Sequence, residues 1–300
     1  MYGFLTLKLK IKLKFKTNYY KINKMEQTTH RVYNGSRGED FKACLRRVLE
    51  RAELKEKYIE LLLSPEGLSV YNTAFTSGTA DEENNYEVFE QLGDLSANKF
   101  INWYMYRRFP QLNCPGGVKV VARLRINYGS KQSFWKIAQS LGFWDFITAS
   151  EDERSSKMKP LLEDTLESFI GSTEYFLDTK IRMGVGYAIV YDILASIFDD
   201  IPISLEYTDL YDDKTRLKEL FDYFKNLGTL KYRETKTDMI TTSTVSYITG
   251  GQTIVIGQGS ASLKADAQKS AAAQGLITLK RMGYEKPIPE IYAMFSKNLT

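Results

Sequence analysis

The stretch Asn85-Tyr-Glu-Val-Phe-Glu-Gln-Leu-Gly-Asp94 carries the strongest signal in this 300-residue chain. Its acids Glu87, Glu90 and Asp94 are spaced by three and four residues. In an α-helix that spacing puts the three carboxylates on one face. Each like-charged pair destabilises an isolated helix by roughly 0.2–0.5 kcal/mol, so we expect a positive partner, and a bound cation would provide it.

A second pair of acids at helical spacing, Asp164 and Glu167, follows further along the chain. Apolar neighbours flank both acidic segments, so each helix would place its carboxylates beside a buried stripe. If the two helices face each other, their carboxylates form a set of hard oxygen ligands that suits Mg²⁺ or Mn²⁺. Such an ion activates water for attack on a phosphodiester. Alternatively, both segments are solvated faces of ordinary surface helices.

Together, the two segments resemble the two signature motifs of the ribonuclease III family. Residues 85–94 are similar to the family pattern Asn-Glu-x-x-Glu-(aromatic)-Leu-Gly-Asp. The segment Asp164-Thr-Leu-Glu-Ser-Phe-Ile-Gly171 is similar to Asp-x-x-Glu-(small)-(apolar)-(apolar)-Gly. Both motifs occur in the family's order, which makes the resemblance specific. It implies an all-α endonuclease domain.

The resemblance also implies roles for individual residues. The family's metal ligands correspond to Glu90, Asp94, Asp164 and Glu167, and Glu87 corresponds to the outer acid of its catalytic set. The implied cofactor is Mg²⁺ or Mn²⁺, and the implied reaction is hydrolysis of double-stranded RNA to 5′-phosphate and 3′-hydroxyl ends. A homodimer through the catalytic domain is implied as well, because each centre in the family cuts one strand.

Two residues of the first motif depart from the family pattern, so the chain resembles a diverged member. Tyr86 stands where the family has asparagine. Gln91 stands where the family has an aromatic residue that packs across the dimer. The change at Gln91 predicts a weaker or differently packed dimer.

The C-terminal third of the chain has a different pattern. We expect a helix over 214–227, strands over 230–237, 243–248 and 252–256, and a last helix over 263–282. This α-β-β-β-α order, with Gly257-Gln-Gly259 before an alanine-rich helix, resembles a double-stranded-RNA-binding domain. The predicted fold is therefore an all-α ribonuclease III domain followed by a small α+β domain.

The second resemblance implies RNA contacts through Lys264, Lys214, Lys218 and Gln258. Lys264 is the strongest candidate, because such domains direct a helix N-terminus and its lysines at phosphates and recognise the shape of A-form RNA. The loop 237–242 lacks the Gly-Pro-x-His that the family uses in the minor groove. Affinity should therefore depend more on the first helix of the domain and on RNA shape.

Changes in composition mark the expected domain boundaries. The chain is expected to comprise a basic, disordered extension over 1–37, the catalytic domain over 38–198, an acidic linker over 199–213, the RNA-binding domain over 214–283 and a tail over 284–300. Within the catalytic domain, apolar periodicity predicts one amphipathic helix over 38–63 and a continuation of the first acidic helix to Arg108.

The N-terminal extension contains seven lysines and no acid within residues 1–24. Its apolar and basic residues alternate with a period of two, which fits neither the apolar segment of a signal peptide nor an amphipathic transit helix. The extension could contact phosphate, act in targeting, or lie upstream of a natural start at Met25.

Other features of the sequence exclude several classes of protein. No apolar run reaches the roughly 18 residues that a membrane span requires. Cys44 and Cys114 cannot form a disulfide framework and lack metal-ligand spacing, which favours an intracellular, reducing compartment: the cytoplasm, or the host cytoplasm for a viral protein. The sole histidine, His30, lies outside every motif, so catalysis must depend on metal rather than on a histidine acid–base pair.

Two other functions are compatible with the same residues. A non-catalytic protein could sequester or scaffold duplex RNA, and it would bind the duplex without cutting it. A helical interaction protein without RNA affinity would show no salt-dependent duplex binding.

Overall fold

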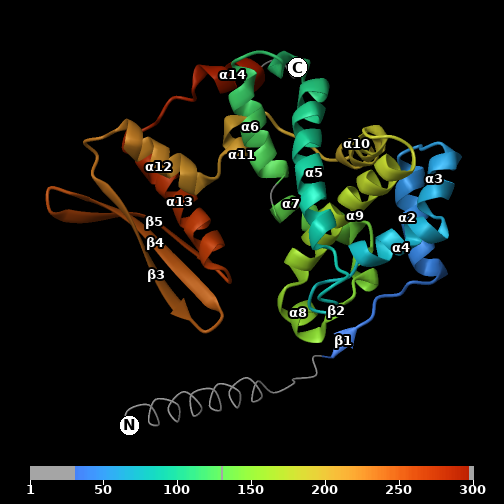
Figure 1. Ribbon diagram of the computed structural model, residues 1–300. Coiled ribbons are helices and arrows are strands. Elements are labelled where there is room, and N and C mark those ends of the chain that lie inside the picture. The colour runs from blue at the N-terminus through green and yellow to red at the C-terminus, as the bar shows by residue number, and fades with distance from the viewer. Residues whose placement is uncertain (1–30, 130, 297–300) are drawn as a thin grey trace, which may run out of the picture. The chain divides into compact units, whose positions relative to one another are not determined.

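The computed structural model describes residues 31–129 and 131–296 (Figure 1). One compact unit contains the described residues up to Ser96 together with Phe134–Ile193. The other contains Ala97–Ser133 and the described residues from Leu194 onward. Helix α5 (Glu87–Arg108) contributes to both and confirms the predicted continuation to Arg108. The lysine-rich segment 1–24, Met25 and His30 lie outside the described residues.

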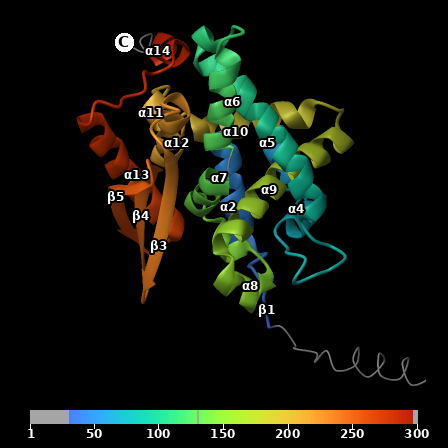
Figure 2. The same cartoon turned by 90° about the vertical axis from the view of Figure 1, so that its left-hand side faces the viewer.

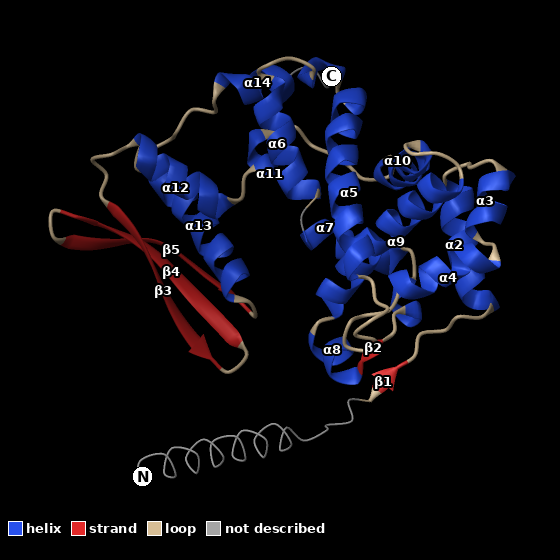
Figure 3. Cartoon of the chain, in the orientation of Figure 1, coloured by secondary structure: helices blue, strands red, loops and turns tan. Residues whose placement is uncertain are grey.

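The first unit is helical apart from a short ribbon (Figure 3). Besides its part of α5, it contains α2 (Glu39–Arg51), α3 (Glu56–Leu62), α4 (Pro65–Ala74), most of α7 (Lys131–Ser140), the turn η2 (Phe143–Phe146), α8 (Glu151–Ser156), α9 (Met158–Lys180) and most of α10 (Val185–Phe198). The ribbon pairs β1 (Val32–Tyr33) antiparallel with β2 (Ala149–Ser150). Two residues per strand are too few for an alternating pattern, so the sequence does not predict this ribbon.

Helix α9, which carries the second acidic motif, is embedded in the core of the first unit. Most of its residues between Leu161 and Leu177 are buried. The ring of Tyr71 on α4 stacks on Phe169 with 5.5 Å between centroids, and the Tyr71 hydroxyl hydrogen-bonds the Thr173 hydroxyl at 2.9 Å. Aromatic contacts at 5.0–5.4 Å between centroids continue the core through Phe143, Phe75 and Phe41. This packing fixes the position of α9.

The single helix predicted over 38–63 is wrong. Helix α2 ends at Arg51 and α3 begins at Glu56. Between them Glu53 adopts a left-handed conformation with φ 52°, which interrupts the helix. The sequence has no glycine or proline at the break, and the apolar residues on both sides keep helical spacing. The sequence pattern therefore gives no sign that the helix ends here.

The disorder predicted for 1–37 does not extend over residues 31–37. Val32 and Tyr33 form β1, and the side chain of Arg37 is half-buried. Arg37 donates to the backbone oxygens of Phe75, at 3.1 Å, and Phe146. These hydrogen bonds to carbonyls compensate for burial of the cation and attach the segment to the first unit.

The second unit contains the α-β-β-β-α arrangement predicted for the C-terminal third. Helices α12 (Asp213–Tyr223) and α13 (Lys264–Arg281) lie on one face of an antiparallel sheet (Figures 1 and 2). The strands β3 (Thr229–Thr237), β4 (Ile240–Thr249) and β5 (Gln252–Ala261) follow the order β3-β4-β5. The core between helices and sheet includes Leu217, Phe221, Val245, Ile256 and Ala271.

Strand β5 is longer than predicted, because Gly257-Gln-Gly259 lies within it rather than leading out of it. A Cβ atom on Gly257 would overlap the backbone oxygen of Ala271 and lie 2.7 Å from the backbone nitrogen of Gly275. The glycine therefore allows α13 to pack closely on the strand. A sequence pattern cannot distinguish this role from a turn.

Short helices occupy parts of the expected linker and tail. Helix α11 (Tyr207–Leu210) lies within 199–213, and α14 (Glu290–Ser296) lies within 284–300. The second unit also contains η1 (Pro110–Leu112) and α6 (Gly117–Tyr128), whose Arg123 donates to the backbone oxygen of Leu210 at 2.7 Å. Within the described residues, no helix combines the length and the apolar character needed to cross a bilayer.

Candidate metal centre

The site begins where α5 and α9 cross at two glycines. A Cβ atom on Gly93 would overlap the backbone oxygen of Glu167 and lie 2.5 Å from its carbonyl carbon. A Cβ atom on Gly171 would overlap the backbone oxygen of Phe89 and lie 2.7 Å from the Gly93 nitrogen. The two backbones therefore touch, and only hydrogen fits between them. This approach brings the acidic faces of both helices together.

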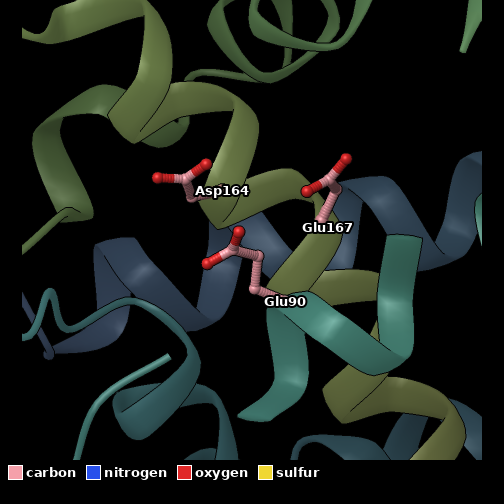
Figure 4. Close-up of side chains that lie close together, drawn as sticks. All are labelled: Glu90, Asp164 and Glu167. Carbon is pink, nitrogen blue, oxygen red and sulfur yellow. The ribbon is translucent and has the colours of Figure 1, made fainter. Parts of the chain in front are cut away.

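Three of the predicted ligands converge at the crossing (Figure 4). Glu90 projects from α5, and Asp164 and Glu167 project from α9. Each residue offers a carboxylate oxygen, and these oxygens all lie within 4.8 Å of one another. Hard oxygen donors at such separations fit a small divalent cation that retains part of its water shell.

The other two predicted site residues lie outside this group of three. Asp94 is exposed one turn after Glu90, and its negative charge still acts on Glu167. Glu87 is the first residue of α5 and is exposed. Its backbone N–H donates to the side-chain oxygen of Asn85 at 3.1 Å, which helps to start the helix.

The carboxylate of Glu167 is in an unfavourable environment for a negative charge. Its side chain is almost fully buried, and burial together with the nearby acids raises its pKa from 4.5 to about 8. The largest contribution after burial comes from Glu163, one turn earlier on α9 and itself 4% exposed. A divalent cation would relieve this repulsion.

Sequence reasoning missed two residues beside the acids. Glu163 is a buried acid in an otherwise apolar run, and its spacing of four from Glu167 was the available signal. Tyr86 was recognised only as a departure from the family pattern. Its hydroxyl donates to Oδ2 of Asp164 at 3.1 Å.

The segment that carries these acids matches a known protein family. The Ribonuclease III domain model matches residues 87–175, which include all five predicted acids. A protein of Invertebrate iridescent virus 6 named "Putative ribonuclease 3" is 47% identical over 263 residues, which cover 83% of this chain and 90% of the viral protein. The chain belongs to the ribonuclease III family.

Two further relatives of this ribonuclease III chain have lower sequence identity and match a smaller part of it. A protein of the same name from Frog virus 3 (isolate Goorha) is 43% identical over 235 residues, covering 77% of this chain and 61% of that protein. The solved nuclease domain of ribonuclease III from Campylobacter jejuni is 26% identical, with a TM-score of 0.39, and covers 52% of this chain and 99% of that one.

Family membership confirms the predicted enzyme class and fold class. The protein is a ribonuclease III-type endoribonuclease, and its helical nuclease domain is followed by an α-β-β-β-α unit that is consistent with a double-stranded-RNA-binding domain. The acidic group of Glu90, Asp164 and Glu167 is compatible with the catalytic site of such an enzyme.

In this ribonuclease III chain, two of the predicted RNA contacts lie in one network. Lys264, the first residue of α13, forms an ion pair with Glu234 at 3.2 Å. Lys214 on α12 donates to Gln268 at 2.6 Å, and Gln268 donates to Glu234. The ammonium groups of Lys214 and Lys264 therefore lie at the same end of the α-β-β-β-α unit.

The remaining two predicted RNA contacts are exposed but differ in position. Lys218 lies one turn after Lys214 on α12. Gln258 lies between Gly257 and Gly259, whose α-carbons face α13. Because successive residues of a strand point to opposite faces, the Gln258 side chain projects from the face of the sheet that the helices leave open. The structure does not bring Gln258 together with the lysines.

Proposed function

We propose that this protein is a divalent-metal-dependent endonuclease that hydrolyses double-stranded RNA to products with 5′-phosphate and 3′-hydroxyl ends. The observation that carries the proposal is the convergence of Glu90, Asp164 and Glu167 from two distant segments within 4.8 Å. Family membership supplies the reaction class.

In the proposed mechanism, the ion supplies the reacting water and the acidic residues bind the ion. When bound, Mg²⁺ or Mn²⁺ supplies a water of lowered pKa and neutralises charge on the phosphate. Glu90, Asp164 and Glu167 would hold the ion, and Asp94 would add negative charge beside them. Burial and the nearby acids raise the pKa of Glu167 and so favour its protonated form, whereas a bound cation would favour its ionised form. Glu87 remains our candidate for the outer acid.

A cleavage assay tests the proposed function. A duplex RNA, its separate strands and a duplex DNA of the same sequence are each incubated with the protein in Mg²⁺, Mn²⁺ or EDTA. We expect cutting of the duplex RNA with either metal and of nothing in EDTA, and the products should accept ligation at a 5′-phosphate. Duplex binding without any cutting in either metal would overturn the proposal in favour of a scaffold.

We propose that Lys264, Lys214 and Lys218 contact RNA phosphates and that Gln258 makes a separate contact. The three lysines surround the N-terminal ends of α12 and α13, where backbone N–H groups also favour anions. Glu234 holds Lys264 in the free protein through an exposed ion pair, which is weak enough for a phosphate to replace.

Substituting both network lysines provides the first prediction. The double variant Lys214→Ala/Lys264→Ala should bind all duplex sequences more weakly, and the slope of log affinity against log salt should fall by about 2 because two phosphate contacts are lost. Fluorescence anisotropy over a salt series measures both. Lys231→Ala is the matched control, since Lys231 is exposed on β3 where the neighbouring Tyr232 faces the core. A normal slope in the double variant contradicts the assignment.

We propose that the protein acts as a homodimer through an exposed apolar surface on α5 and α9. Val88, Leu92 and Leu95 on α5, Tyr175 on α9, and Met183 just after α9 are exposed there. Several of them line a hollow of about 390 Å³ together with Gly171 and Glu174. Apolar surface of this kind marks protein interfaces. Light scattering should give twice the mass of the chain, and Leu95→Glu should give the monomer; a monomeric wild type would reject the proposal.

The remaining assignments follow from the sequence and stay proposals. We assign 38–198 to the nuclease domain, 199–213 to the linker, 214–283 to the RNA-binding domain and 284–300 to the tail. We also place the protein in an intracellular, reducing compartment, where the exposed free thiol of Cys114 stays reduced. Thiol titration of the protein isolated under non-reducing conditions should find both cysteines free.

A further inference from the structure

Tyr86 is a buried tyrosine whose hydroxyl touches the metal centre. Its side chain is 6% exposed, and the hydroxyl donates to Oδ2 of Asp164 at 3.1 Å. The backbone also fixes the residue: its N–H donates to the oxygen of Thr76 at 2.9 Å, and its own oxygen accepts from the N–H of Glu90 at 2.8 Å. The ring therefore has a defined position immediately before α5.

Ser77 and Thr79, which precede Tyr86 in the chain, form hydrogen bonds to another part of the first unit. Ser77, 1% exposed, lies against the Tyr86 hydroxyl and donates to Oε2 of Glu153 at 2.6 Å. Thr79 donates to the same carboxylate oxygen at 2.7 Å. The backbone N–H of Ser77 donates to the oxygen of Thr148 at 2.8 Å. These contacts hold the surroundings of the phenol in place.

The chemistry of the contact determines which group is the donor. Burial, together with the negative charge of Asp164, raises the pKa of the Tyr86 hydroxyl above its usual value, so the phenol keeps its proton. A carboxylate is acceptor-only when ionised, so Tyr86 donates and Asp164 accepts. A donor on one carboxylate oxygen favours the charged form of the group and restricts its rotation.

We propose that Tyr86 is a positioning residue: its phenol holds the Asp164 carboxylate in the orientation in which it binds the divalent cation. The inference rests on the proposed function, because it requires Asp164 to be a metal ligand. Hydrogen-bonding partners of metal ligands set ligand orientation and affinity in many metal sites. Tyr86 supplies such a partner at a position where the family pattern has asparagine.

The test compares two tyrosine-to-phenylalanine variants of the full chain. Tyr86→Phe keeps the ring and removes only the hydroxyl. The matched control is Tyr71→Phe, which removes a hydroxyl bound to Thr173 on the same helix α9. We expect Tyr86→Phe to weaken binding of Mn²⁺ alone, measured by calorimetry without RNA, by about 10- to 100-fold, and Tyr71→Phe to leave it unchanged.

Two further measurements separate a positioning role from a structural one. The unfolding temperature measured in EDTA should fall by a similar amount in both variants, since each loses one buried hydrogen bond. Raising Mn²⁺ to saturation should restore cleavage by Tyr86→Phe to within about threefold of wild type, because the loss lies in metal affinity. A loss of Mn²⁺ affinity in Tyr71→Phe as large as in Tyr86→Phe would assign the effect to stability and overturn the inference.

A double-mutant cycle tests whether Tyr86 acts through Asp164. In an Asp164→Asn background, Tyr86→Phe should change Mn²⁺ affinity less than about twofold, since the group it orients is gone. An undiminished effect there, or wild-type affinity in Tyr86→Phe alone, overturns the inference and leaves the proposed function intact. Wild-type protein that binds no Mn²⁺ overturns both.

Discussion

Glu167→Gln is expected to cut duplex RNA about 10³-fold more slowly than the wild type, or worse, while binding the duplex normally. Glutamine keeps the size of the side chain but removes the carboxylate that we propose as a ligand of the cation. A factor of 10³ corresponds to roughly 4 kcal/mol of lost transition-state stabilisation, within the several kcal/mol that a catalytic metal supplies. Single-turnover cleavage at saturating Mg²⁺ measures the rate, and anisotropy measures the binding.

The same substitution should make the metal-free protein more stable at alkaline pH. The pKa of Glu167 is raised to about 8 by burial and by the acids around it. In the unfolded chain the group titrates near 4.5, so between these values the folded state holds one proton more than the unfolded state. Stability therefore falls as pH rises through this window, and the loss is complete above pH 8. Glutamine does not titrate, so the Glu167→Gln variant does not lose stability in this way as the pH rises.

The expected gain can be measured and controlled. In EDTA, the free energy of unfolding of Glu167→Gln should exceed that of the wild type by roughly 1–4 kcal/mol at pH 8, and the two should be nearly equal at pH 4. Urea unfolding at the two pH values gives both differences. Glu60→Gln, the same change at an exposed position on α3, should alter neither cleavage nor the pH dependence. Wild-type cleavage by Glu167→Gln would remove this residue from the catalytic set.

Activity and stability thus impose opposite demands on this position. Burial and four neighbouring acids oppose ionisation of Glu167. A bound divalent cation would favour the ionised form of Glu167. Added Mg²⁺ should accordingly raise the unfolding temperature of the wild type more than that of Glu167→Gln.

Helical spacing made most of the acidic site predictable. The faces shared by Glu90 with Asp94, and by Asp164 with Glu167, follow from 3.6 residues per turn and need no knowledge of the fold. The meeting of the two faces does not follow from spacing alone. It depends on the backbone contact at Gly93 and Gly171, and in the sequence these glycines gained meaning only through the resemblance to the family.

Features that depend on tertiary burial were not predictable in the same way. Glu163 is a polar residue in an apolar run, and only the packed helix shows that its carboxylate lies beside that of Glu167. Glu53 adopts the left-handed conformation that separates α2 from α3, and no neighbouring glycine or proline predicts this break.

Gly93→Ala is expected to be among the most destabilising single substitutions in the protein. In the interior of a helix, replacing glycine by alanine normally favours folding by roughly 0.5–1 kcal/mol, because alanine restricts the unfolded chain. Here the added methyl group would overlap the backbone oxygen of Glu167 and lie 3.0 Å from the backbone nitrogen of Gly171. Backbone atoms of α9 cannot rotate away as a side chain can, so α5 and α9 must separate.

That separation should cost about 3 kcal/mol or more, since overpacking at a rigid contact adds to the loss of the packing around it. Gly275→Ala is the matched control: this helical glycine faces only side-chain carbons, at 3.3–3.4 Å, and its substitution should change stability by less than about 1 kcal/mol. Urea unfolding followed by circular dichroism measures both variants. Where Gly93→Ala still folds, Mn²⁺ affinity should fall together with stability, because displacing α5 moves Glu90 away from Asp164 and Glu167. Normal stability with normal metal affinity would mean that the two helices can tolerate a wider crossing, and that the glycine contact is not what assembles the site.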